Sequence, residues 1–152
     1  MKLLIYVLIL ISQISVPTTS VVPRKETQTL LSPILSLRAD AESLEGKEKQ
    51  SALEKSEKLI ARLFEMKTRA SDEALVVLMN FYVGESLQPD LVHEVTLRGK
   101  RMLPLLLKYS TASVTFSERE YPSSMLLTDE VRKKNFQDAI EGVRSGRAVG
   151  ED

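Results

Sequence analysis

The sequence predicts an all-α protein of four to six helices. Leu, Ile, Val, Ala, Glu and Lys dominate its 152 residues, and most of these side chains lose little rotamer freedom in a helix. Apolar residues make up 43% of the chain, enough for a packed core, while aromatic residues make up only 5%. Apolar positions recur at helical spacing over most of the length. We therefore expect antiparallel helical hairpins, arranged either as an α-solenoid fragment or as a compact helical bundle.

The charge balance and the lack of cysteine exclude several classes of function. There are 21 basic and 21 acidic residues, so the formal net charge is zero and the basic footprint of a nucleic-acid-binding protein is missing. Without cysteine there is no disulfide, no thiolate metal site and no cysteine nucleophile. We expect no nucleic-acid partner and no cofactor.

The N-terminus has the layout of a secretory leader. Lys2 precedes an apolar run over residues 3–11, and Thr18 and Ser20 occupy the −3 and −1 positions of a possible cleavage site before Val21. The apolar run is shorter than the roughly 20 residues that a membrane span needs. The layout therefore predicts a signal peptide over residues 1–20 and export, to a periplasmic or extracellular location. In the alternative interpretation the leader is uncleaved and attaches the protein to a membrane.

After the leader, residues 21–28 combine a proline with several charges and are predicted to be a flexible tether. A single helical domain follows over residues 29–146. Its first helix begins near Thr27 or at Ser32, since serine is a favourable N-cap, and ends before Gly46. The predicted core stripe of this helix is Leu30, Ile34, Leu37, Ala41 and Leu44.

The second helix is predicted from about Lys47 to Arg69, and the dense alternating charges near its start are interpreted as a solvated face. The third helix should begin at Ser71, with acidic residues in its first turn, and end at Gly84. Its apolar residues between positions 74 and 82 cover so much of the surface that this helix should be central.

The fourth helix should open at Pro89 and continue to Tyr109. Gly99 and Pro104 interrupt its apolar stripe, so a kink or break is predicted between about Lys100 and Leu103. The interior glycine costs up to about 1 kcal/mol relative to alanine, which indicates a packing role or a break at that position.

Residues 110–127 lack helical periodicity. Residues 113–116 alternate weakly, but one short strand without a partner predicts no sheet. A last helix is predicted from Thr128, its cap, to about Ser145, with Val131, Phe136, Ala139, Ile140 and Val143 facing the core. Residues 147–152 are predicted to be a disordered tail.

The segment from Ser71 to Tyr109 reads as a capped amphipathic helix, a short turn and a second helix with basic residues midway. It resembles a HEAT-type helical repeat unit, which also joins two helices within about 40 residues. The resemblance covers about a quarter of the chain. It implies a HEAT-like α-solenoid fragment, and the compact bundle remains the alternative fold.

His93 is the only histidine, with Asp90 and Glu94 on the same opening turns of a helix. A metal site needs about three or four converging ligands, and no second histidine or cysteine is available. The sequence also lacks the Gly-x-Ser-x-Gly elbow and a phosphate-binding loop. We expect no catalytic or metal-binding residue. The alternative is a small extracytoplasmic enzyme or metal-binding protein that uses His93 with Asp90 or Glu94.

Arg98, Lys100 and Arg101 form the only compact basic cluster near the predicted core. They are the candidate partner-binding residues, because guanidinium groups hold carboxylates in bidentate geometry. The alternative is that their stems cover apolar surface while the charges stay in water. Together these observations predict an exported, non-catalytic helical protein that acts through contact with an unknown protein partner.

Overall fold

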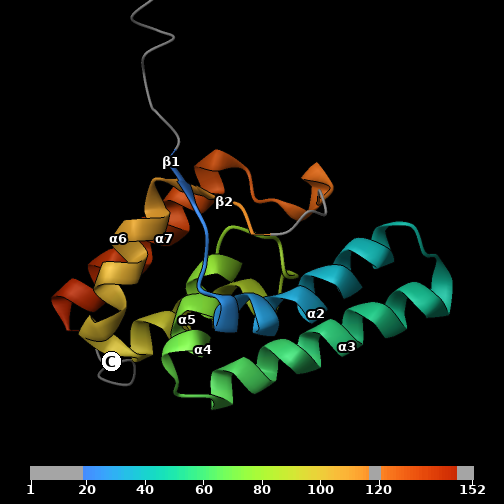
Figure 1. Ribbon diagram of the computed structural model, residues 1–152, viewed down its shortest axis with the longest axis horizontal. Helices are drawn as coiled ribbons and strands as arrows, with labels where there is room; N and C mark the ends of the chain where they lie inside the picture. The colour runs from blue at the N-terminus through green and yellow to red at the C-terminus, as the bar shows by residue number, and fades with distance from the viewer. Residues whose placement is uncertain (1–18, 117–120, 147–152) are drawn as a thin grey trace, which may run out of the picture.

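The computed structural model describes residues 19–116 and 121–146 (Figure 1). The predicted tail over residues 147–152 and most of the predicted signal peptide lie outside this range. In chain order the elements are β1 (Thr19–Val21), α2 (Lys25–Glu42), α3 (Gly46–Glu65), α4 (Arg69–Leu78), α5 (Leu87–Leu97), the 3-10 helix η1 (Gly99–Met102), α6 (Leu103–Ser110), β2 (Ala112–Val114), the 3-10 helix η2 (Ser123–Met125) and α7 (Asp129–Ser145). The all-α prediction is confirmed.

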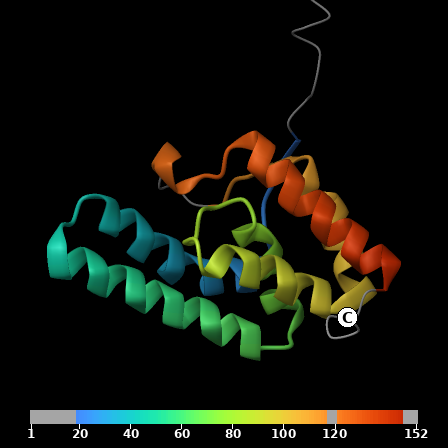
Figure 2. The same ribbon diagram turned by 180° about the vertical axis from the view of Figure 1, so that it is seen from behind.

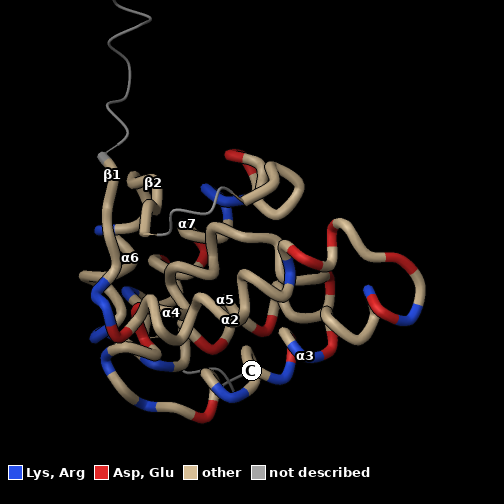
Figure 3. Tube along the Cα trace, turned by 45° about the vertical axis from the view of Figure 1, so that its right-hand side comes forward, with Lys and Arg blue, Asp and Glu red and all other residues tan. Residues whose placement is uncertain are grey.

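Helices α2 and α3 form an antiparallel hairpin whose connecting end projects away from the other helices (Figure 1). On α3 the buried residues are spaced at intervals of three to four positions, which gives the helix one narrow core-facing stripe: Ala52, Ser56, Ile60 and Leu63. Basic and acidic residues are interspersed along the hairpin (Figure 3), and all the charged residues from Glu42 to Lys58 are exposed. The solvated charged face predicted here is confirmed.

Helix α4 lies at the centre of the molecule, as predicted, and all residues from Ala70 to Phe81 are buried. Its cap differs from the prediction, because Thr68 is the N-cap and Ser71 completes a reciprocal capping box with it. Its C-terminus also comes earlier. The helix ends at Leu78, and Gly84 lies in the following loop with φ of +109°.

The break predicted in the fourth helix is present. Helix α5 ends at Leu97, and Gly99 has φ of +79°, a conformation that side chains other than glycine rarely adopt. The 3-10 turn η1 then leads into α6, where Pro104 occupies the first turn and needs no N–H partner.

Two short strands, which the sequence did not predict, pair in parallel. The register sets Ser20 opposite Ser113 and Val21 opposite Val114, and the Ser20 hydroxyl donates to the Thr115 hydroxyl at 2.8 Å across 95 residues of chain. The prediction of no sheet was wrong because the partner strand lies far away in the sequence. The predicted cleavage site before Val21 falls inside β1.

The residues expected to be a tether are ordered in the structure. Val21 is part of β1, α2 begins at Lys25, and the side chain of Thr27 is completely buried. The physical reason is again long-range: the backbone N–H of Arg24 donates to the carboxylate of Glu73 on α4 at 3.0 Å. Residues 21–28 therefore belong to the folded domain.

Helix α7 has the bounds predicted from the sequence. The hydroxyl of Thr128 accepts from the N–H of Val131, and Gly146 ends the helix in the left-handed conformation. The side chains that enter the core are Phe136, Ala139 and Val143. Val131, which was expected to face the core, is 45% exposed.

Helix α7 packs against both α5 and α6, and in Figure 2 it lies along one side of the molecule, opposite the α2–α3 hairpin. Over the described part of the chain, no helix is long and apolar enough to cross a membrane.

Candidate partner-binding surface

Arg98, the first candidate partner-binding residue, is a core residue. Its side chain is 1% exposed, and its guanidinium donates to Asp72 at 2.7 Å and to Glu94 at 3.1 Å. A third bond, at 2.8 Å, reaches the backbone carbonyl of Leu63 near the end of α3. Arg98 thus ties α3, α4 and α5 together, and it is not available to a partner.

The other two residues of the basic cluster remain at the surface. Arg101 is half-exposed and forms an ion pair with Asp72 at 3.1 Å, whereas Lys100 is exposed. The three side chains therefore do not converge on one external site. The sequence feature that could have predicted the burial of Arg98 is Asp72. An acidic side chain on a helix expected to be central needs a cation beside it.

Glu94 belongs to the same network and is not free to act with His93. Burial alone would raise the pKa of Glu94, but hydrogen bonds from Lys67 and Arg98 outweigh it and hold the pKa below its usual value. Glu94 is therefore an ionised partner of two cations.

His93 and Asp90 are both exposed on α5. Within residues 19–116 and 121–146, no group of three or more histidine, aspartate and glutamate side chains is placed to hold a metal ion. The enzyme or metal-binding alternative stays a prediction without a supporting geometry.

A second buried carboxylate, which sequence reasoning missed, lies on α4. Glu73 has a side chain only 2% exposed, with Arg24 Nε at 3.7 Å and Lys108 Nζ at 3.9 Å. The hydroxyls of Thr27 and Tyr109 lie against this carboxylate, although neither meets strict hydrogen-bond geometry.

These contacts fix the protonation states of the buried cluster. Burial favours the neutral form of Glu73, yet the contacts from Thr27 and the Arg24 N–H, with the charges of Lys108 and Arg24, hold its pKa below the usual value. Burial and the neighbouring Glu73 raise the pKa of Tyr109. Because the carboxylate is ionised and out of reach of solvent, its role is to hold the start of α2 and the end of α6 near α4.

Asn80, two residues after the end of α4, also has an arginine from another element as its partner. Arg132 of α7 donates to the Asn80 side chain at 2.6 Å and to the carbonyl of Tyr109 at 2.7 Å. Burial lowers the pKa of Arg132. Asp72, Glu73 and Asn80 each contact an arginine from outside α4, which explains how a segment buried from Ala70 to Phe81 tolerates these polar side chains.

A groove of about 700 Å³ runs between α5 and α7. At one end the helices touch, because a Cβ added to Gly142 would lie 2.8 Å from Cγ2 of Thr96. The exposed Val131 stands toward the other end of the lining on α7. The groove is lined by Glu85, Gln88, Pro89, Val92, His93, Thr96, Val131, Lys134, Asn135, Asp138 and Gly142.

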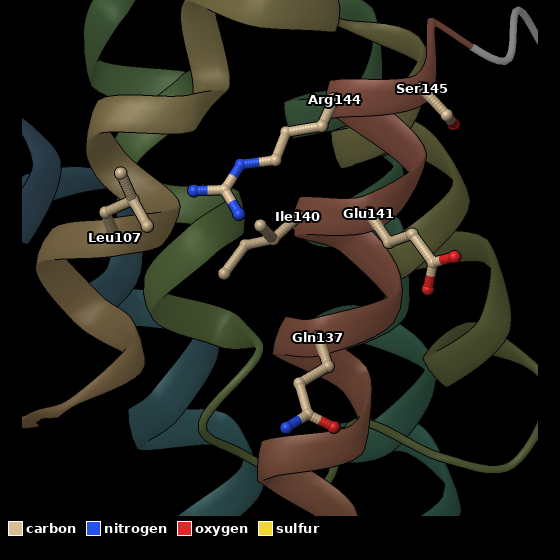
Figure 4. Close-up of a pocket in the computed structure, with 6 residues that line it drawn as sticks. All are labelled: Leu107, Gln137, Ile140, Glu141, Arg144 and Ser145. Carbon is tan, nitrogen blue, oxygen red and sulfur yellow. The ribbon is translucent and has the colours of Figure 1, made fainter.

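A second hollow, of about 690 Å³, lies between α6 and α7 (Figure 4). Leu107 of α6 forms one wall. Ile140 extends from α7 into the hollow toward α6. Figure 4 shows the guanidinium of Arg144 extended across the hollow toward α6, while Glu141 points away. Gln137 and Ser145 complete the lining.

The groove and the hollow lie on opposite flanks of the buried stripe of α7. That stripe contains Phe136, Ala139 and Val143, whereas the α7 residues on either side of the stripe line the two depressions. We call the groove and the hollow together the α7 surface. It is the candidate site that replaces the predicted cluster around Arg98.

No protein-family model, no curated protein and no solved structure matches this chain. The resemblance of residues 71–109 to a HEAT-type unit therefore stays a prediction.

Proposed function

We propose that the protein is an exported, non-catalytic helical protein that binds a partner protein through the α7 surface. The observation that carries this proposal is the pair of open depressions along the two flanks of one helix. Apolar side chains in such depressions favour contact with another apolar surface, because contact removes them from water.

The open shape of the two depressions supports a macromolecular partner. A site for a small ligand buries roughly 70–90% of the ligand's surface. Both depressions of the α7 surface are open to solvent along the helix, so each would cover only one side of an occupant. A helix or extended segment of a partner suits such a groove, since its outer side remains in contact with its own protein.

Export is supported by the leader alone. Lys2, the apolar run over residues 3–11 and the small residues before Val21 fit a secretory signal, and a membrane attachment follows if this segment is retained. Fractionation of the producing cells, with the mass of the mature chain, tests this part of the proposal. A full-length chain found only with cytoplasmic proteins would contradict it.

Partner binding is tested by one substitution in the groove and one matched control. Val131→Asp places a charge at the groove, so we expect cross-linked capture from the extracytoplasmic fraction to be lost. Val22→Asp changes a valine that is 61% exposed outside the α7 surface and should leave capture unchanged. Equal capture by both variants would contradict the proposal.

Substitution of His93 separates the proposal from its alternative. His93→Ala removes the lone imidazole from the groove wall. If purified wild-type protein carried a stoichiometric metal that the variant lacked, the metal-binding alternative would replace the binding proposal.

A further inference from the structure

The second depression of the α7 surface has a definite charge, which specifies the chemistry of its occupant. We propose that the hollow between α6 and α7 receives a partner segment in which a carboxylate side chain stands beside a large apolar side chain. The inference rests on the proposed function, since it names the partner chemistry of the α7 surface.

Arg144 supplies the charge. Within the described residues its guanidinium forms no ion pair and no hydrogen bond. The exposed Arg62 and Arg69 also have no such partner, but of these three arginines only Arg144 lines the hollow. Figure 4 shows it extended over the hollow, with the nearest acid of the lining, Glu141, directed away. The hollow thus presents five N–H donors without an anion, the geometry that binds a carboxylate in bidentate fashion.

The remaining lining supplies an apolar contact next to that charge. Leu107 is 45% exposed and Ile140 is half-buried, and Figure 4 shows both near the Arg144 guanidinium. An occupant that held only a charge would leave these side chains in water, and one that was only apolar would desolvate Arg144 without compensation. A segment with both groups side by side satisfies both parts of the hollow.

Arg144 also stands in the last turn of α7, where a cation interacts favourably with the helix dipole. That interaction is weak at an exposed position, so the residue can be replaced without unfolding the protein. Arg144→Gln is therefore a usable probe of binding.

The experiment is an NMR titration of the full chain, without its leader if it is processed, labelled with nitrogen-15. The probe is the dipeptide N-acetyl-Leu-Glu-amide, and its reference is N-acetyl-Leu-Gln-amide, which has the same shape without the charge. We expect the Glu probe to shift amide signals of Leu107 and of residues 137–145. The Gln reference should bind at least about fivefold more weakly.

Two variants make the assignment specific. Arg144→Gln should reduce the affinity for the Glu probe to that for the Gln reference. Arg62→Gln, which removes an exposed arginine from α3, should leave the affinity unchanged. An unchanged spectrum outside the substituted helix shows that each variant is folded.

Three results would overturn the inference. The first is equal affinity for the Glu and Gln dipeptides, and the second is a response centred away from the hollow. The third is self-association in sedimentation that Arg144→Gln abolishes, which would make a second copy of the chain the occupant. Loss of capture by Val131→Asp without any charge preference at the hollow would leave the proposed function intact, so the two can fail separately.

Discussion

At the scale of single residues, Arg98 shows that a charged side chain can stabilise the core instead of binding a partner at the surface. In the sequence it belongs to a basic cluster beside Lys100 and Arg101, but its side chain is 1% exposed. Its partners Asp72 and Glu94 come from two helices, so the interaction stabilises the relative position of those helices.

We expect Arg98→Ala to lower the free energy of unfolding by about 3–5 kcal/mol, because it leaves Asp72 buried without its closest cation. Urea unfolding followed by circular dichroism measures the change. Lys100→Ala is the matched control and should change stability by less than about 0.5 kcal/mol. Similar losses in both variants would show that the network around Arg98 does not stabilise the fold.

Gly99 permits the break between α5 and η1 through its backbone conformation. A Cβ added there would meet no atom within 4 Å, but φ is +79°. We expect Gly99→Ala to lower stability by about 1–2 kcal/mol, with Gly99→Asn less harmful, since asparagine tolerates positive φ better. Thermal unfolding of the two variants tests this. A higher melting temperature for Gly99→Ala would contradict it.

At the scale of elements, the contact between α5 and α7 sets the shape of the groove. The two helices approach each other closely at Thr96 and Gly142, where an added Cβ would lie 2.8 Å from Cγ2 of Thr96. The glycine is thus required for a close approach of helices.

We expect Gly142→Ala to lower stability by about 1–3 kcal/mol through overpacking. Thr96→Ser removes Cγ2, so the double variant should lose less than the sum of the single variants. A double-mutant cycle of unfolding free energies measures this coupling. Additive losses would mean that the two positions do not meet.

The pairing of β1 with β2 gives a prediction about processing. Cleavage before Val21 would remove Thr19 and Ser20, two of the three residues of β1 and the hydrogen bond to Thr115. We expect a chain that starts at Val21 to exchange its β2 amide hydrogens faster than a chain that starts at Thr19. Identical exchange in the two chains would show that β1 does not protect β2.

At the scale of the whole molecule, the buried carboxylates determine the response to acid. The pKa values of Glu73 and Glu94 are lowered in the folded state, so the unfolded chain binds protons more readily as the pH falls. The stability they contribute is complete above their unfolded pKa of about 4.3 and is lost as the pH falls through the folded values.

We therefore expect the unfolding free energy of the wild-type protein to decrease from about pH 5 downward. In Glu73→Gln the decrease should be less steep, because one of these proton-linked groups is absent. Urea unfolding at a series of pH values measures both slopes. Equal slopes would show that Glu73 titrates alike in both states.

The sequence by itself determined the local features of this protein. The all-α class, the broad apolar α4, the cap of α7 at Thr128, its end at Gly146 and the break near Gly99 all follow from short-range rules: side-chain periodicity, capping and backbone freedom. These rules act within a few residues, so a single sequence contains them.

Only the tertiary structure decided which residues meet across the chain. It placed Arg98 inside and Val131 outside, paired β1 with a strand more than 90 residues later, and packed the first residues after the predicted leader against Glu73. It also placed Arg144 beside Leu107, which formed the hollow on α7. The physical reason is that burial and ion pairing depend on neighbours in space, and periodicity within one helix does not specify which helix lies opposite.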